Sequence, residues 1–215
     1  MRIDHIVFYS SDLAQARSDF SRSMDQEPLY GGEHPGEGTA NALLGLGPAT
    51  YLEILGRDVA QPEHALDEDV RALGGSGIYH WAAGGVDLEA LAARAAKAGL
   101  EGGARVPGGR VKPDGTRLDW VCWGLRNHRF GSLIPFFIDW RGAEHPAQSV
   151  PRGASLASFE VHSPEADVLR GIFQTLGLDV PVIESDTPQV VAQLESAKGV
   201  TTLTSFSPLP KGYVI

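Results

Sequence analysis

A strand that carries a histidine occurs twice in this chain, and this repeat limits the folds that the chain can adopt. Residues 3–9 are apolar, β-branched and aromatic around His5, and they end shortly before an Asp-Leu pair. Residues 78–83 repeat the pattern around His80, again with an isoleucine two residues before the histidine and an Asp-Leu pair after it. Such a composition predicts strands. A histidine at one position of two copies predicts a site between the copies.

The same order of elements, one strand, one helix and three strands, is predicted around each histidine. The predicted division is module one at residues 1–56, a connector at 57–77, module two at 78–141 and a third related unit at 153–206. The connector is predicted to be irregular, with room for one helical turn or more around residues 63–73. One copy alone is too small to bury a face of its sheet well, so two copies are expected to pair and leave a cleft.

The predicted fold is therefore α+β, with paired βαβββ modules that form a curved mixed sheet around a cleft. The third unit adds a C-terminal βαβββ-like element, in which Ser158 stands where the histidine would fall. An open sheet in this third unit would let two copies of the chain pair, so a homodimer is one alternative.

Charge and hydropathy limit the classes of partner. The 215 residues are 42% hydrophobic and carry a formal net charge of −9, which argues against nucleic acid or an anionic membrane as the main partner. No apolar run approaches the roughly 18 residues that a membrane span needs, and the first residues lack the apolar core of a signal peptide. We therefore expect a cytoplasmic protein whose partner is a small-molecule substrate.

Two histidines and one carboxylate with open positions form the ligand set of many non-haem metal enzymes. Glu53 lies in the apolar strand 51–55, where a carboxylate is costly unless it is paired or bound. If the strands are neighbours, His5, Glu53 and His80 converge on a divalent metal ion, with Fe, Zn, Mn and Ni as candidates. The alternatives are hydrogen-bonded structural histidines and a glutamate that faces solvent.

Four further residues are predicted to contact substrate. Asn41 follows a glycine-rich turn, and Trp120 lies in a strand that either lines the cleft or fills the core. Phe137 aligns with Glu53 when the two modules are superposed by sequence, so it would occupy the position of a fourth ligand. Asp139 shares the strand face of Phe137 and either approaches the site or caps the end of its strand.

The chain resembles the vicinal oxygen chelate superfamily, the glyoxalase, bleomycin-resistance and extradiol dioxygenase group. The stretches His34-Pro35-Gly36-x-Gly38-Thr39-x-Asn41, Tyr51-Leu52-Glu53-Ile54 and Pro135-Phe136-Phe137-Ile138-x-Trp140 resemble its glyoxalase-like domain branch. The resemblance implies a cleft between paired βαβββ modules, with metal ligands on the first and last strand of each. Phe137 departs from the fourth ligand, the carboxylate that serves glyoxalase I as a base. The single glutamate also lies in module one, whereas extradiol dioxygenases carry theirs in the second module.

Two functions remain open at this stage. One is a metal-dependent enzyme of the lyase, isomerase or dioxygenase type that acts on a small oxygen-rich molecule, with the metal as a Lewis acid. The alternative is a non-catalytic protein of the bleomycin-resistance type that binds or sequesters a small molecule in the same cleft.

Overall fold

The computed structural model describes residues 1–34, 36, 38–62, 75–111 and 117–210. The helical segment expected within the connector lies outside the described residues. The elements of module one are β1 (Arg2–Ser10), α1 (Leu13–Met24), β2 (Leu29–His34), β3 (Thr39–Gly47) and β4 (Thr50–Arg57). Those of module two are β5 (Ser76–Gly84), α3 (Leu88–Lys97), β6 (Glu101–Val111), β7 (Arg117–Arg126), the 3₁₀ turn η1 (Gly131–Leu133) and β8 (Phe136–Asp139). A second 3₁₀ turn, η2 (Pro146–Gln148), leads to β9 (Ser155–Ser163), α4 (Ala166–Leu176), β10 (Val182–Glu184), β11 (Gln189–Ser196) and β12 (Gly199–Thr204).

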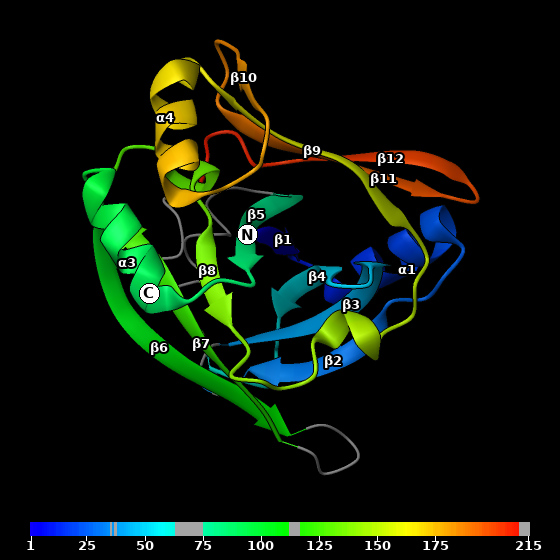
Figure 1. Cartoon of the computed structure of the whole chain (residues 1–215). Coiled ribbons are helices and arrows are strands. Elements are labelled where there is room, and N and C mark those ends of the chain that lie inside the picture. The colour runs from blue at the N-terminus through cyan, green and yellow to red at the C-terminus, as the bar shows by residue number, and fades with distance from the viewer. Residues whose placement is uncertain (35, 37, 63–74, 112–116, 211–215) are drawn as a thin grey trace.

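The two modules form one eight-stranded mixed sheet in the order β2-β3-β4-β1-β5-β8-β7-β6. β1 pairs antiparallel with β5 at the centre, and each of these strands pairs in parallel with the last strand of its own module. The halves therefore repeat one topology about the β1/β5 seam. The sheet curls strongly, with α1 and α3 on its outer face (Figure 1). This confirms the predicted curved sheet of paired βαβββ modules.

Alternation along β1 divides the molecule into two apolar regions. Ile6 is buried in the large core between the sheet and the helices, whereas Val7 belongs to a cluster on the concave face. Both module helices begin at the Asp-Leu pair that follows each histidine-bearing strand. Asp12 accepts a hydrogen bond from the backbone N–H of Gln15, and Asp87 caps α3 in the same way.

The third unit builds a separate four-stranded sheet, β10-β9-β11-β12, with α4 beside it. It packs on the outer side of the seam, where the fully buried Trp81 contacts the rings of Phe159 and Phe173 at 4.9 and 6.2 Å between centroids. Burial of aromatic rings of this size is a major source of stability. The third unit thus covers the outer face of the strand that carries His80.

Two strands of module two differ in length from what their local sequence indicates. The apolar run from Ser132 to Trp140 would suit one strand, but β8 is shorter, because η1 occupies the start of this run and Pro135 cannot donate a ladder hydrogen bond. The pattern around Gly103–Val106 indicates a short strand, whereas β6 runs from Glu101 to Val111, since its glycines hide the alternating pattern. In the described part of the chain, no helix is long and apolar enough to cross a membrane.

Candidate active site

A cavity of about 350 Å³ lies on the concave side of the sheet. Strands from both modules supply its walls, including the edge strands β2 and β6. The described residues that line it are His5, Val7, Glu33, His34, Asn41, Leu43, Tyr51, Glu53, Leu55, Val106, Pro107, Gly108, Gly109, Leu118, Trp120, Cys122, Phe136, Ile138, Trp140 and Pro146.

A β-bulge in β1 places Asp4 beside His5. In a regular strand these neighbours would point to opposite faces. The register of β1 on β5 shifts between Ile3 and His5, which leaves Asp4 as the extra residue. Its Oδ1 therefore reaches the Nδ1 of His5 at 2.9 Å. A carboxylate accepts only, so His5 donates through Nδ1–H, and in the neutral ring its Nε2 is an acceptor.

Asp4 is fully buried and receives hydrogen bonds from three rings. The indole N–H of Trp140 lies 3.2 and 3.1 Å from its two oxygens, and the Nε2 of His145 lies 3.1 Å from Oδ2. His145 is itself fixed, because its Nδ1 accepts from the backbone N–H of Ala147. Burial by itself would raise the pKa of Asp4, but the hydrogen bonds from His145 and His5 outweigh it and hold that pKa well below its usual value.

Gly84 has no side chain, and Asp4 occupies the space that a side chain at this position would fill. A Cβ at this position would lie 2.3 Å from the Oδ2 of Asp4. The carboxylate cannot move away without breaking hydrogen bonds to three rings.

We therefore expect Gly84→Ala to destabilise the protein by about 1–3 kcal/mol and to shift Asp4 away from His5. Urea unfolding measures the change in the free energy of unfolding. Gly171→Ala in α4 is the matched control, because a Cβ added there would meet no other atom within 4 Å. That substitution should be neutral or slightly stabilising. Equal effects of the two substitutions would contradict this account of Gly84.

Glu53 on β4 lines the same cavity as His5. Its Oε2 is 3.7 Å from the His5 Nε2, and its Oε1 accepts from the Asn41 amide at 2.6 Å. The same amide lies 3.2 Å from the Nε2 of His34, whose Nδ1 contacts the hydroxyl of Thr39 at 2.9 Å. Because Glu53 accepts only, the nitrogen of Asn41 must face it, and His34 must accept through Nε2.

The ring of His5 is held on its faces as well as at its edge. Tyr51 stacks on it with centroids 4.7 Å apart and an interplanar angle of 17°. Phe136 contacts it edge-on at 5.4 Å. Together with Asp4, these contacts fix both the position and the direction in which Nε2 points.

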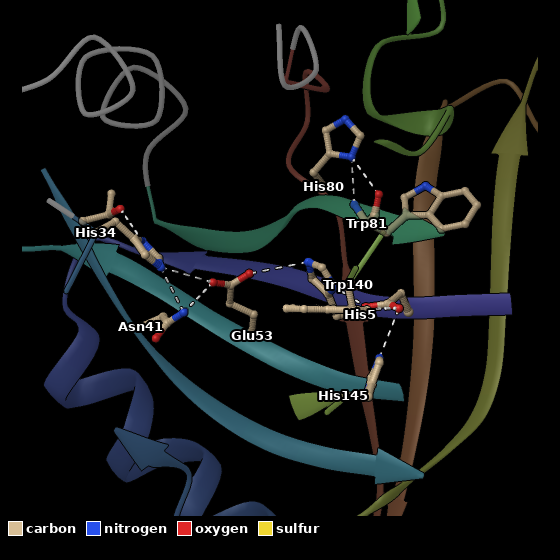
Figure 2. A network of polar contacts seen from close by, with 10 residues as sticks. His5, His34, Asn41, Glu53, His80, Trp81, Trp140 and His145 are labelled. Atoms are coloured by element: carbon tan, nitrogen blue, oxygen red, sulfur yellow. Dashed lines mark hydrogen bonds and ion pairs between the residues drawn. The ribbon is translucent and has the colours of Figure 1, made fainter. Parts of the chain in front are cut away.

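His80 lies apart from this group. Its Nδ1 accepts from the backbone N–H of Trp81 at 2.9 Å, and its ring contacts Phe136 edge-on. Figure 2 shows the ring turned toward the Trp81 backbone rather than toward Glu53. Burial lowers the pKa of His80 to about 4, with smaller contributions from His128 and His5. His80 is therefore neutral at pH 7.

The structure places the other predicted substrate contacts in different surroundings. Asn41 and Trp120 line the cavity. Phe137 does not, because it is fully buried in the outer core and packs against Trp123. Asp139 accepts from the backbone N–H of Arg141 at 2.9 Å and caps the end of its strand.

The residue of module two that corresponds to Glu53 is Phe136 rather than Phe137. Glu53 pairs with Val7, two residues after His5, and Phe136 pairs with Ala82, two residues after His80. The sequence alignment that pairs Phe137 with Glu53 is therefore wrong by one residue. Because neighbouring residues of a strand point to opposite faces, Phe136 lines the cavity whereas Phe137 lies in the outer core. An aromatic residue still stands at this position.

The donors that converge fit part of the predicted metal centre. His5 and Glu53 supply an imidazole nitrogen and a carboxylate, and a second carboxylate behind the histidine is the usual arrangement at metal-bound imidazoles. Within the described ranges, however, no group of three His, Cys, Asp or Glu side chains is arranged to hold a metal ion. The residues present fit a centre with two protein donors, whose other positions water or substrate would fill.

Three participants are not predicted from the sequence. Regular alternation along the first strand points Asp4 away from His5, so only the bulge brings the two together. Trp140 and His145 lie at the end of module two and in the following linker, and nothing in their local sequence indicates that they return to β1.

Comparison with known proteins agrees with this architecture. The model of the glyoxalase-like domain family matches residues 3–177. A hypothetical protein from Staphylococcus aureus has a similar structure, with a TM-score of 0.64, 17% identity and coverage of 93% of this chain and 84% of that one. A variant of 4-hydroxymandelate synthase from Streptomyces coelicolor has a TM-score of 0.50 at 18% identity, over 96% of this chain and 63% of that one. Among curated protein sequences, none matches this chain significantly.

Proposed function

Because the chain belongs to the glyoxalase-like domain family, within the vicinal oxygen chelate superfamily, we propose that the concave cavity is the active site of a divalent-metal-dependent enzyme. Its substrate is a small oxygen-rich molecule, and its reaction is of the lyase, isomerase or dioxygenase type. His5 and Glu53 hold the metal ion, with Fe, Zn, Mn and Ni as candidates.

The observation that carries this proposal is the line of groups from Asp4 through His5 to Glu53. A fully buried carboxylate would be expensive without a dedicated set of donors. Here it fixes His5 in the tautomer whose Nε2 points at Glu53 across 3.7 Å. A carboxylate that accepts from the far nitrogen of a histidine is the usual arrangement at metal-bound imidazoles.

When bound, the ion supplies a Lewis acid that polarises a substrate oxygen. The chain itself supplies orientation. Asp4 and Tyr51 hold the ring of His5, and the amide of Asn41 holds one oxygen of Glu53 while the other remains directed at His5. Apolar side chains around these groups lower the local dielectric, which strengthens electrostatic interactions in the cavity.

Metal content tests the proposal directly. Purified protein is expected to bind a divalent ion, as measured by elemental analysis after dialysis against Fe, Zn, Mn or Ni. His5→Ala and Glu53→Gln should each weaken binding by about 100-fold or more, because each removes one of two donors. His80→Gln should leave metal content unchanged, since His80 lies apart, and Glu184→Gln on β10 is the surface control. Wild-type protein that binds none of the four metals would contradict the proposal.

The apolar wall that module two contributes favours one second candidate, a protein that binds a small molecule without transforming it. Trp120, Phe136 and Trp140 line the cavity, but no acidic or basic side chain of module two does so among the described residues. Ligand binding that is unchanged by a chelator, without turnover in the presence of metal, would favour this candidate.

A further inference from the structure

The linker that follows module two returns to module one. It is tied to β3, because the backbone N–H of Gly45 donates to the carbonyl of Pro151 at 2.8 Å. Pro146 of the linker lines the cavity. An apolar cluster joins the linker to β3 and β4, and its members are Leu43, Tyr51, Trp140, Ala147 and Val150. Residues 142–151 therefore belong to the surroundings of the site, although they follow both modules in the chain.

His145 of this linker has both ring nitrogens engaged, and the two have different roles. Its Nδ1 accepts from the backbone N–H of Ala147 at 3.2 Å. A nitrogen that accepts carries no proton, so the proton lies on Nε2, which donates to the Oδ2 of Asp4 at 3.1 Å. The residue is only 6% exposed. A buried ring with both nitrogens bonded has one orientation, so the donor to Asp4 is fixed in place.

Asp4 presents its two oxygens to different partners. Its Oδ1 accepts from His5 at 2.9 Å, whereas its Oδ2 accepts from His145. The indole N–H of Trp140 does not distinguish the oxygens, because it lies 3.2 and 3.1 Å from them. Apart from His5 itself, His145 is thus the described partner that selects one oxygen. Its hydrogen bond fixes the rotation of the carboxylate and turns Oδ1 toward His5.

His145 also contacts a second residue that holds His5. Tyr51 stacks on the ring of His5, and the ring of His145 meets Tyr51 at an interplanar angle of 69° with centroids 5.7 Å apart. His145 is not among the described residues that line the cavity. Its connection to the site consequently runs through Asp4 and Tyr51.

We propose that His145 is a positioning residue of this site: it orients Asp4, and through Asp4 it holds the Nε2 of His5 in the direction that a metal ion requires. The affinity for a divalent ion then depends on a linker residue that belongs to neither module. The inference rests on the proposed function in taking His5 as a metal ligand. Loss of a group that orients a metal-bound histidine costs about 10- to 100-fold in metal affinity, and His145 acts from one residue further away, so we expect the lower end of this range.

Three substitutions of His145 separate the orientation of Asp4 from the other contacts of this side chain. His145→Gln keeps an N–H near the position of Nε2 and so retains a donor to Asp4. His145→Asn keeps an acceptor for the backbone N–H of Ala147 at the N-cap of η2, but its side chain is too short to reach Asp4. His145→Phe keeps a ring beside Tyr51 without either nitrogen.

The affinity of the full chain for Zn²⁺ is measured by competition with a chromophoric chelator. We expect it to fall by about 10-fold in His145→Asn and His145→Phe, and by no more than about 3-fold in His145→Gln. His162→Asn in the third unit is the matched control and should leave the affinity unchanged, since the described side-chain partner of His162 is Glu160. In Asp4→Asn protein, His145→Asn should cost less than about 3-fold, because a residue that acts through Asp4 has little effect once that carboxylate is gone.

The ring signals of His5 in nitrogen-edited NMR spectra of metal-free protein provide a readout that needs no bound ion. They should shift in His145→Asn, and they should stay near their wild-type positions in His145→Gln and in His162→Asn. Because glutamine and asparagine both remove the ring of His145, the difference between these two variants reports the donor to Asp4.

Recovery of the affinity by His145→Asn rather than by His145→Gln would overturn the inference, because the side chain would then serve only to cap η2. An equal loss in all three variants, or no loss in any, would overturn it as well. The outcomes separate this inference from the proposed function. Wild-type protein that binds none of the four metals, with His5 signals in the expected order, removes the metal-dependent function alone, whereas metal binding that does not respond to His145 removes the inference alone.

Discussion

Replacing Asp4 with alanine is expected to destabilise the protein by about 3–5 kcal/mol, the usual result of removing one partner from a buried charged network. The substitution leaves the N–H groups of His5, Trp140 and His145 without the acceptor that all three share. The three N–H groups meet at a fully buried position, so loss of the carboxylate leaves them without their acceptor in the protein interior. The free energy of unfolding from urea titration measures the effect.

Two further variants define what the carboxylate does. Asp4→Asn keeps the shape and one acceptor oxygen, so we expect a smaller loss of stability but a His5 ring that is no longer held in one tautomer. Nitrogen chemical shifts of the imidazole report the tautomer. Asp179→Ala on the exposed surface should change stability by no more than about 0.5 kcal/mol. An Asp4→Ala protein as stable as wild type would show that the three donors have other partners.

Acidification from about pH 6.5 to pH 4 is expected to cost about 3 kcal/mol of stability through His80 alone. Burial lowers the pKa of this histidine from 6.5 to about 4 in the folded protein. Between these values the unfolded chain binds a proton that the folded chain does not, so stability falls as the pH falls. Above pH 6.5 neither state binds it, and the contribution is complete.

Unfolding free energies of wild type and His80→Gln, measured at intervals from pH 7 to pH 4, test this. The variant should lose about 3 kcal/mol less than wild type across the range. His128, whose pKa burial also lowers, contributes in the same direction but is present in both proteins, so it cancels in the comparison. Parallel curves for the two proteins would show that His80 is not the group responsible.

The repeat of a histidine-bearing strand is sufficient to predict the paired modules, because each copy opens with the same apolar strand followed by an Asp-Leu pair. The meeting of His5 and Glu53 is also predictable, since both lie in strands of one module. The pairing of Phe136 rather than Phe137 with the Glu53 position is not predictable in this way. A shift of one residue in the alignment exchanges the faces of a strand, and only the hydrogen-bonded register decides it.

The sequence by itself determined the repeat, the order of elements, the polar residues in apolar strands and the acidic balance of the chain, because these depend on local periodicity and composition. The tertiary structure alone decided which of the polar residues act together. A β-bulge places Asp4 on the same side of the strand as His5. His145, which lies 141 residues further along the chain, contacts Asp4. The ring of His80 accepts a hydrogen bond from the backbone N–H of Trp81. These depend on register and on contacts across the sheet, which local sequence does not encode.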